Sequence, residues 1–338
     1  MGFHPVLTRV ADGPGFSLGD EVLDGYLAFV SGRCRPNTVR ATAFDLRIFF
    51  DFVAKEPCMV RPSDVMAFIR SQRGVDRKVV ALDGSSGLSP RTIQRRLSSV
   101  SGFFAYLLAI ETPGLRSNPV PRGLPTRRER TRRSAGAPLI RSPRTLPRVL
   151  SVSEVTALRD AMRRDRDRAM IDAMVLGGLR RCEVAGLRLE DIHVGDRRVF
   201  IADGKGGHQR LVPMSNRFFV TLGAYLDRER PRDATTDRVF VALQGRNRGE
   251  ALSLEGIDEI LQGARRRAGL ERGTCHELRH TCFTRLREAG MSLEAIQAQA
   301  GHRSIESTRI YLHLADDWLA AEYRRAAEAI DAQLLGGR

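Results

Sequence analysis

Residues 276–311, HELRHTCFTRLREAGMSLEAIQAQAGHRSIESTRIY, contain side-chain types that together could act on a phosphate group. A guanidinium group pairs with an anion through two parallel hydrogen bonds. A tyrosine hydroxyl can act as a nucleophile, and a histidine can carry a proton near neutral pH. Whether His276, Arg279, His302 and Tyr311 form one site depends on the elements that carry them.

A first helix is expected to carry His276 and Arg279. Thr274 begins it as the N-cap and Gly290 ends it. Its apolar stripe recurs every four residues, at Leu278, Cys282 and Leu286. His276 and Arg279 are three residues apart, so they share a helical face that points away from this stripe.

Two further short helices are expected to carry the other two residues. Ser292 caps a second helix and Gly301 follows its end, which places His302 directly after a tight turn. Ser304 can cap a third helix, with Tyr311 two turns into it. Three short helices joined by tight turns would therefore bring these residues together, which is typical of a functional site.

These residues occur in motifs that resemble the tyrosine recombinase (phage integrase) family. The motifs are H-x-L-R-H, then G-H, then a tyrosine nine residues after that histidine. GLRRCE matches a further family segment and places Arg180 and Glu183, and DGKGG places Lys205 at the tip of a β-hairpin. The resemblance covers residues 18–330, and its one difference is Gln299-Ala300, where the family usually has leucines and where we expect weaker packing of the turn. The family's catalytic set falls, in order, on Arg180, Lys205, His276, Arg279, His302 and Tyr311.

The resemblance implies DNA strand cleavage through a covalent 3′-phosphotyrosine on Tyr311, which conserves the phosphodiester energy for rejoining. Arg180 and Arg279 would stabilise the anionic transition state. His302, and secondarily His276, would donate a hydrogen bond to the phosphate or take the tyrosine proton. We expect no metal and no cofactor, since neither an acidic triad for a two-metal mechanism nor a serine nucleophile is evident.

Lys205 is the expected general acid for the departing DNA oxygen. Arginine cannot release a proton at neutral pH, whereas neighbouring cations can lower the pKa of a lysine. Only three of the 55 basic residues are lysines, so a lysine between glycines at a hairpin tip is unusual in this chain. Glu183 and His280 are expected to support the site, by orienting an arginine and bracing the first helix. Taken singly, each site residue also has an ordinary structural interpretation.

Composition indicates a polyanionic partner. The net charge of +15 and the isoelectric point near 10.7 favour double-stranded DNA. The five cysteines are scattered and lack metal-ligand spacing, which favours a reducing compartment. We find neither a signal-peptide pattern nor an apolar run of membrane-spanning length. We therefore expect a cytoplasmic protein that associates with the nucleoid when bound to DNA.

The expected fold is mainly α with a small antiparallel β-sheet: an N-terminal four-helix core-binding domain and an α+β catalytic domain. Residues 1–16 are expected to be irregular and residues 17–112 to form the helical DNA-binding domain. Its fourth helix begins at Ser89-Pro90 and carries a stripe of buried apolar residues. Arg91, Arg95 and Arg96 project elsewhere and are candidate phosphate contacts, although an ordinary solvated helix face has the same pattern.

The remaining boundaries follow from composition and capping. Residues 113–148 are rich in proline and arginine and are expected to form a linker, because too few apolar residues are present for a core. Ser151 and Glu154 form a capping box that begins the catalytic domain, 149–314. Residues 315–338 are expected to form an amphipathic C-terminal helix, which would either pack on its own domain or dock on a neighbouring protomer.

The expected function is site-specific recombination or integration by a tetramer on two DNA duplexes, as a simple recombinase or one that serves a mobile element. Accessory recombination proteins are candidate partners. The first alternative is a type IB topoisomerase, disfavoured by histidine instead of lysine at position 276 and by a C-terminal helix suited to docking. The second is a DNA-binding accessory protein without catalysis, disfavoured by the joint presence of Lys205 and Tyr311.

Overall fold

The computed structural model describes residues 2–11, 13–74, 87–121, 139–140, 148–202, 209–302, 305–312, 323–324 and 327. The chain divides into two compact units, residues 1–144 and residues 145–338. Within the described ranges, the model has no helix that combines the length and apolar character needed to cross a membrane. The mainly α fold with small antiparallel sheets confirms the expected fold class.

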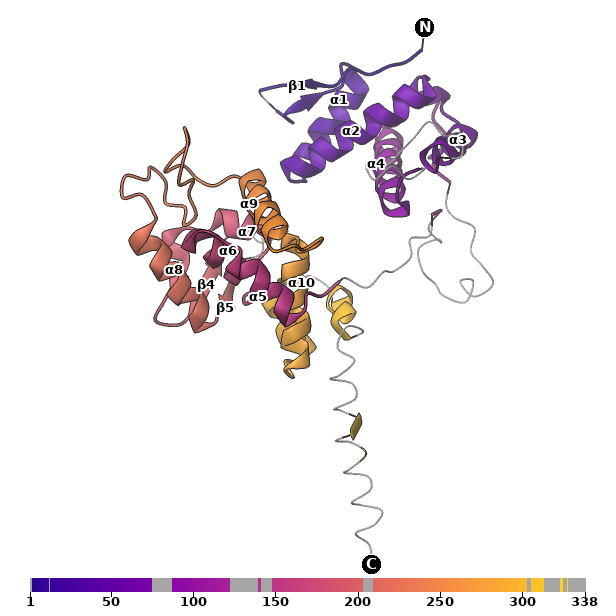
Figure 1. The fold of residues 1–338 in the computed structure, drawn as a ribbon. Coiled ribbons are helices and arrows are strands. Elements are labelled where there is room, and N and C mark those ends of the chain that lie inside the picture. The colour runs from indigo at the N-terminus through magenta and orange to yellow at the C-terminus, as the bar shows by residue number, and fades with distance from the viewer. Residues whose placement is uncertain are drawn as a thin grey trace, which may run out of the picture. The chain divides into compact units, whose positions relative to one another are not determined.

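The first unit is built from four helices, coloured indigo to magenta in Figure 1: α1 (Glu21–Ser31), α2 (Pro36–Val53), α3 (Pro62–Gln72) and α4 (Pro90–Ala109). A proline stands at the first position of three of them, where the missing N–H leaves no bond unmade. The stripe expected on α4 is buried: Ile93, Leu97, Val100, Phe104 and Leu107.

Two details of this unit differ from expectation. Residues 1–16 were expected to be irregular, but β1 (Thr8–Arg9) and β2 (Phe16–Ser17) form an antiparallel pair. The helical domain was expected from residue 17, but its first helix begins at Glu21, because the Asp20 carboxylate accepts hydrogen bonds from two N–H groups of the first turn.

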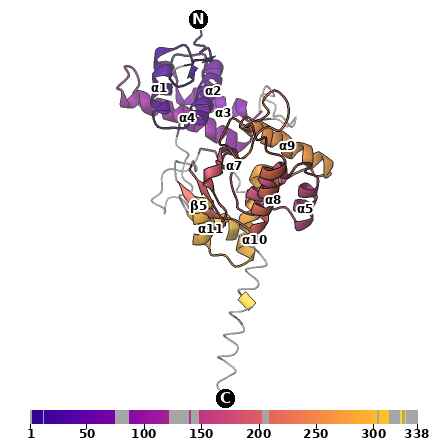
Figure 2. The same ribbon diagram turned by 90° about the vertical axis from the view of Figure 1, so that its left-hand side faces the viewer.

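The second unit surrounds α6 (Asp165–Val175), which is buried on nearly every side and packs against α8 (Asn216–Arg228) and α10 (Cys275–Glu288). A three-stranded antiparallel sheet has the order β3 (Ile192–His193), β4 (Arg198–Ile201), β5 (Arg210–Pro213). Helix α11 (Leu293–Ala300) lies beside β5 (Figure 2). The outer elements are α5 (Val152–Asp160), α7 (Arg181–Gly186), the 3₁₀ turn Leu189–Asp191 and α9 (Leu254–Arg267).

Residues 305–312 are the main correction to the expected elements. Tyr311 was expected two turns into a regular helix, but it lies in a 3₁₀ turn, Arg309–Leu312, which follows another, Ile305–Ser307. The N–H of Tyr311 donates to the carbonyl of Thr308 at 3.0 Å. In a 3₁₀ turn, residues three apart lie on the same side. Thr308 and Tyr311 therefore lie on one side of the turn, and both are buried.

Gly178 gives a prediction for stability. Its φ is +69°, and a Cβ at this position would overlap the Phe283 ring. Gly178→Ala is therefore expected to lower the free energy of unfolding by about 3 kcal/mol or more, through backbone strain and overpacking. Gly223→Ala in α8 is the matched control, because nothing lies within 4 Å of its Cβ position. Urea denaturation should show that variant equal to or slightly more stable than the wild type.

Candidate active site

Arg279, in the second turn of α10, is only 4% exposed. Its Nη1 donates to the carbonyl of Gly178, and its Nη2 donates to the carbonyl of Ala300 at 2.6 Å. The guanidinium carbon lies 4.8 Å from the centroid of the Phe283 ring. Burial, and then the charge of Arg180, lowers the pKa of Arg279 to about 10, so this side chain is still cationic at neutral pH. These contacts fix the plane of the guanidinium group.

A single carboxylate, Glu183, holds three guanidinium groups. It accepts hydrogen bonds from the backbone N–H of Arg180 at 2.8 Å and from its Nη1 at 2.7 Å. Arg210 donates two parallel hydrogen bonds, at 3.0 and 2.9 Å, and Arg279 Nη1 lies 3.9 Å away. Burial raises the pKa of Glu183, but Arg210 and Arg180 outweigh it and bring the pKa down to about 2. Three cations and one anion leave a net charge of +2 in a largely buried position, which suits a phosphate.

Sequence reasoning missed Arg210. It is the first residue of β5, its side chain is 10% exposed, and its Nε donates to the carbonyl of Gln299 at 2.9 Å. No local pattern distinguishes it from the many other arginines of this chain. Gln299 also differs from expectation, because it is buried and its side chain donates to the carbonyl of Gly177 at 3.4 Å. The expected weakness of this turn is thus offset by a hydrogen bond to the segment that precedes Arg180.

Tyr311 is buried, with 1% of its surface exposed, and packs against Phe283. Its hydroxyl lies 3.1 Å from Nδ1 of His280, and Nε2 of His280 lies 2.9 Å from Nε2 of His276. Burial raises the pKa of Tyr311 to about 12, although the charge of Arg279 acts in the opposite direction. The hydroxyl is therefore protonated at neutral pH and needs an acceptor before it can act as a nucleophile.

His302 lies between Arg279 and Tyr311. It follows Gly301, whose left-handed φ of +60° ends α11. Its Nδ1 lies 3.0 Å from the hydroxyl oxygen of Thr308, and its Nε2 lies 3.5 Å from Nη2 of Arg279. The His302 ring is nearly parallel to the Tyr311 ring, with centroids 6.5 Å apart. Burial, together with the charge of Arg279, lowers the pKa of His302 to about 4, so the ring is neutral at pH 7.

This site predicts that acid destabilises the fold. The pKa values of His280 and His302 are both lowered from 6.5 to about 4, His280 by burial and then by His276. Between about pH 6.5 and pH 4 the unfolded chain therefore binds more protons than the folded chain, and stability decreases as the pH falls. Urea denaturation from pH 7.5 to pH 4.5 should show this decrease, and His302→Asn should reduce it. His193→Asn, at an exposed position on β3, should keep the wild-type slope. Equal slopes for all three proteins would contradict the prediction.

The structure brings together most of the residues expected from sequence. Arg180, Arg279, His302 and Tyr311 meet around Glu183 and His280. His276 is exposed and contacts His280, which in turn contacts the tyrosine hydroxyl. His280 was expected to brace the helix, yet it contacts the tyrosine hydroxyl itself. Lys205 lies outside the described residues, as does most of the C-terminal segment 315–338.

The three arginines expected to bind DNA from α4 differ from one another. Arg91 is exposed. Arg95 is half exposed and donates to the buried carboxylate of Asp45 at 2.6 Å. Arg96 does not project away from the core as expected: its side chain is 15% exposed and donates to the side chain of Gln72. Asp45 and Gln72 draw it inward because buried polar groups need partners.

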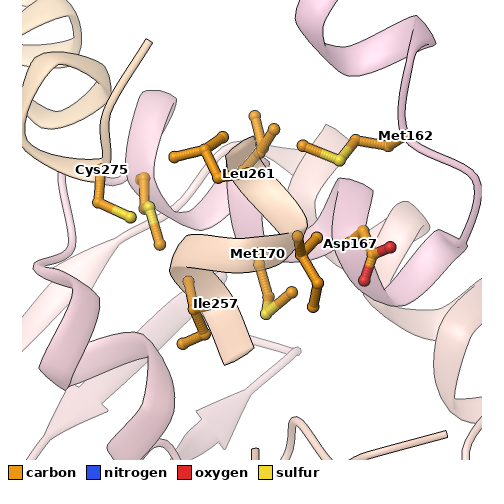
Figure 3. A pocket seen from close by; sticks show the side chains of 9 residues that line it. Met162, Asp167, Met170, Ile257, Leu261 and Cys275 are labelled. Atoms are coloured by element: carbon orange, nitrogen blue, oxygen red, sulfur yellow. The ribbon is translucent and has the colours of Figure 1, made fainter. Parts of the chain in front are cut away.

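A small gap within the second unit is separate from this site (Figure 3). It lies between α6 and α9 and is lined mainly by methionine and aliphatic side chains, among them Met162, Met170, Ile257 and Leu261. Cys275 also lines it, and burial raises the pKa of that thiol. None of the arginine, histidine or tyrosine side chains described above lines this gap, which belongs to the core of the unit.

Comparison with known proteins gives consistent matches. The model of the phage integrase family matches residues 148–317. The tyrosine recombinase XerC of Pelotomaculum thermopropionicum is 30% identical over 324 residues, which cover 90% of this chain and 97% of that protein. The tyrosine recombinase XerD of Listeria monocytogenes is 28% identical over 308 residues, 87% of this chain and 94% of the relative.

Solved structures share the fold. The Tn1549 transposon integrase in complex with a circular intermediate DNA superposes with a TM-score of 0.65 at 17% identity, over 90% of this chain and 99% of that one. The XerH site-specific recombinase bound to a palindromic difH substrate gives a TM-score of 0.62 at 18% identity, over 88% and 82%.

Proposed function

This chain belongs to the phage integrase family and is a tyrosine recombinase, and on that premise we propose that it cleaves and rejoins DNA through a covalent 3′-phosphotyrosine on Tyr311. The observation that carries this proposal is the +2 arginine cluster around Glu183, with Tyr311 and its histidine contact beside it. A positive, partly desolvated cluster stabilises the negative charge that develops on the phosphate oxygens in the transition state.

The proposed roles follow from the contacts. Arg180 is the most exposed of the three clustered arginines, at 19%, and would hold the scissile phosphate, with the charge of Arg279 behind it. The Tyr311 oxygen attacks phosphorus, a P–O bond to the DNA breaks, and Lys205 would supply the proton that the leaving oxygen needs. The free DNA hydroxyl can later attack the phosphotyrosine and reverse the reaction on another strand.

The burial of Tyr311 implies a conformational step. A phenol that is 1% exposed cannot reach a DNA phosphate in this conformation. We propose that DNA binding shifts the 3₁₀ turn 309–312 so that the hydroxyl faces the bound phosphate while it keeps its hydrogen-bond contact with Nδ1 of His280. Such a step would keep the nucleophile inactive until a substrate is present.

The proposed substrate is double-stranded DNA. The charge of +15 supports it, as do the DNA-bound structures that share the fold. We propose that residues 17–112 form the core-binding domain, 113–148 the linker and 149–314 the catalytic domain, with residues 315–338 docking on a neighbouring protomer in a tetramer on two duplexes. Arg91 and Arg95 are the proposed phosphate contacts of the first domain, because both are accessible.

We favour a simple recombinase over one that serves a mobile element. The relatives that match nearly over their whole length are called tyrosine recombinases XerC and XerD. The likeness to a transposon integrase is a likeness of fold at 17% identity. The name of that protein therefore carries less weight for this chain.

Strand cleavage tests the proposal. Duplexes that tile the DNA flanking the gene, each with a nick that traps the intermediate, should give a protein–DNA adduct stable in denaturing electrophoresis. Retarded DNA without any adduct would favour a catalytically silent DNA-binding protein. Relaxation of a supercoiled plasmid that lacks the cleaved sequence would favour a topoisomerase.

A further inference from the structure

The side chain placed to accept the Tyr311 proton differs from the one expected from sequence. Sequence reasoning assigned it to His302, and secondarily to His276. In the structure both ring nitrogens of His302 contact other groups, Thr308 and Arg279. The nitrogen in hydrogen-bond contact with the Tyr311 hydroxyl is Nδ1 of His280, at 3.1 Å.

We propose that His280 is a catalytic residue, the acceptor of the Tyr311 proton, and that His276 is the outer member of a two-histidine relay. The inference rests on the proposed function, because it concerns the same nucleophile. His280 Nε2 and His276 Nε2 are 2.9 Å apart, and the two rings are nearly perpendicular, with centroids 4.3 Å apart. The two histidines are four residues apart on α10, so one helical face carries the whole relay.

The direction of the hydrogen bonds follows from basicity. A neutral imidazole has one donor nitrogen and one acceptor nitrogen. An imidazole nitrogen is a much stronger base than a phenol oxygen, so the Tyr311 hydroxyl donates to His280 Nδ1. The Nε2–H of His280 then donates to Nε2 of His276. This arrangement needs a neutral His280, and the charged groups around it favour that form.

Most of the groups around His280 lower its pKa. Burial, followed by the charges of His276 and Arg279, lowers the pKa of His280 to about 4, whereas Glu277 acts the opposite way. A base this weak cannot deprotonate a resting phenol whose pKa is about 12. Transfer becomes favourable as the O–P bond forms, because bonding to phosphorus makes the phenol more acidic. The relay is then needed, because a cation held at His280 would lie beside Arg279.

Proton transfer through the two histidines accompanies formation of the bond between the Tyr311 oxygen and phosphorus. The Tyr311 oxygen bonds to phosphorus and its proton moves to Nδ1 of His280. The Nε2 proton of His280 moves to Nε2 of His276, which becomes an imidazolium at an exposed position and releases a proton to water. The P–O bond to the leaving DNA oxygen breaks, and that oxygen takes its proton from another donor.

The first test needs no DNA. Two-bond ¹⁵N–¹H spectra of the full chain with ¹⁵N-labelled histidine report which ring nitrogen carries the proton, and His280→Asn assigns the signals. At pH 7 we expect His280 to be neutral, with the proton on Nε2 and none on Nδ1. A proton on Nδ1 at pH 7 would overturn the relay.

The second test is the pH dependence of adduct formation on a nicked duplex that the wild type cleaves. In His280→Asn, the amide side chain would keep a hydrogen-bonding atom near the Nδ1 position but cannot take a proton. This variant should lower the single-turnover rate at pH 7 by about 10² to 10⁴-fold. Its rate should then rise about tenfold per pH unit between pH 7 and pH 9, because hydroxide must remove the phenol proton. The wild type should show a much flatter profile.

The controls separate the possible outcomes. His193→Asn, at an exposed position on β3, should keep the wild-type rate and profile. A purely structural role of His280 would lower the rate by the same factor at every pH, and that parallel profile would overturn the relay while leaving the proposed function intact. Failure of the wild type to form an adduct on any duplex would instead overturn the proposed function and the relay together.

Discussion

Arg279→Lys is expected to lower single-turnover adduct formation by about 10³-fold, a loss comparable to that of one transition-state donor. Lysine keeps the positive charge but has no planar group with several N–H donors. The carbonyls of Gly178 and Ala300, which Arg279 now bridges, would lose their shared donor. The phosphate would meet a charge that is no longer held in a fixed orientation.

The same substitution should reduce the free energy of unfolding by about 1–3 kcal/mol, because a buried carbonyl is left without a partner. Arg285→Lys on the same helix is the matched control. Arg285 donates to the carbonyl of Leu150 and lies outside the arginine cluster. Equal cleavage rates for the two variants, each corrected for its folded fraction by urea denaturation, would show that the geometry of Arg279 is not needed.

Glu183→Gln is expected to lower the free energy of unfolding by about 3–5 kcal/mol, the effect of breaking a buried ion pair. The Glu183 side chain is fully buried and neutralises part of the charge of Arg180, Arg210 and Arg279. Glutamine keeps the shape of the side chain, but the three cations lose their shared anion. Its amide N–H₂ would also face an arginine donor.

The lowered pKa of Glu183 determines how the stability difference between the wild type and Glu183→Gln changes with pH. The pKa of Glu183 is lowered from 4.5 to about 2 in the fold, so its stabilisation is complete above about pH 4.5 and is lost as the pH falls through about 2. The stability difference between wild type and Glu183→Gln should therefore narrow below pH 4.5. Glu154→Gln, at a more exposed capping carboxylate, should cost about 1 kcal/mol. A Glu183 variant no less stable than the Glu154 variant would contradict the account.

The parts of this structure that depend on local chemistry could be predicted from sequence. The capping side chains of Thr274 and Ser292 begin α10 and α11 at the expected residues, and the apolar stripe of α4 is buried as expected. The resemblance placed four residues of the site on segments that meet in space: Arg180, Arg279, His302 and Tyr311.

What could not be predicted depends on contacts between segments distant in sequence. Arg210 joins the site only because β5 lies beside α11 and α7 carries Glu183. His280 contacts the nucleophile where Tyr311 lies in a 3₁₀ turn instead of the expected regular helix. Arg96 turns inward because Asp45, on another helix, is buried. Helical periodicity gives no information on such pairings.

The most direct measurement is the identity of the residue that bonds to DNA. Trypsin releases residues 310–324, which contain both Tyr311 and Tyr323, and further digestion with Asp-N before Asp316 separates them. Mass spectrometry of the trapped adduct should place the nucleotide remnant on the fragment with Tyr311, and Tyr311→Phe should bind DNA without forming any adduct. A remnant on Tyr323, or an adduct that persists in the Tyr311→Phe variant, would contradict the assignment of Tyr311 as the nucleophile.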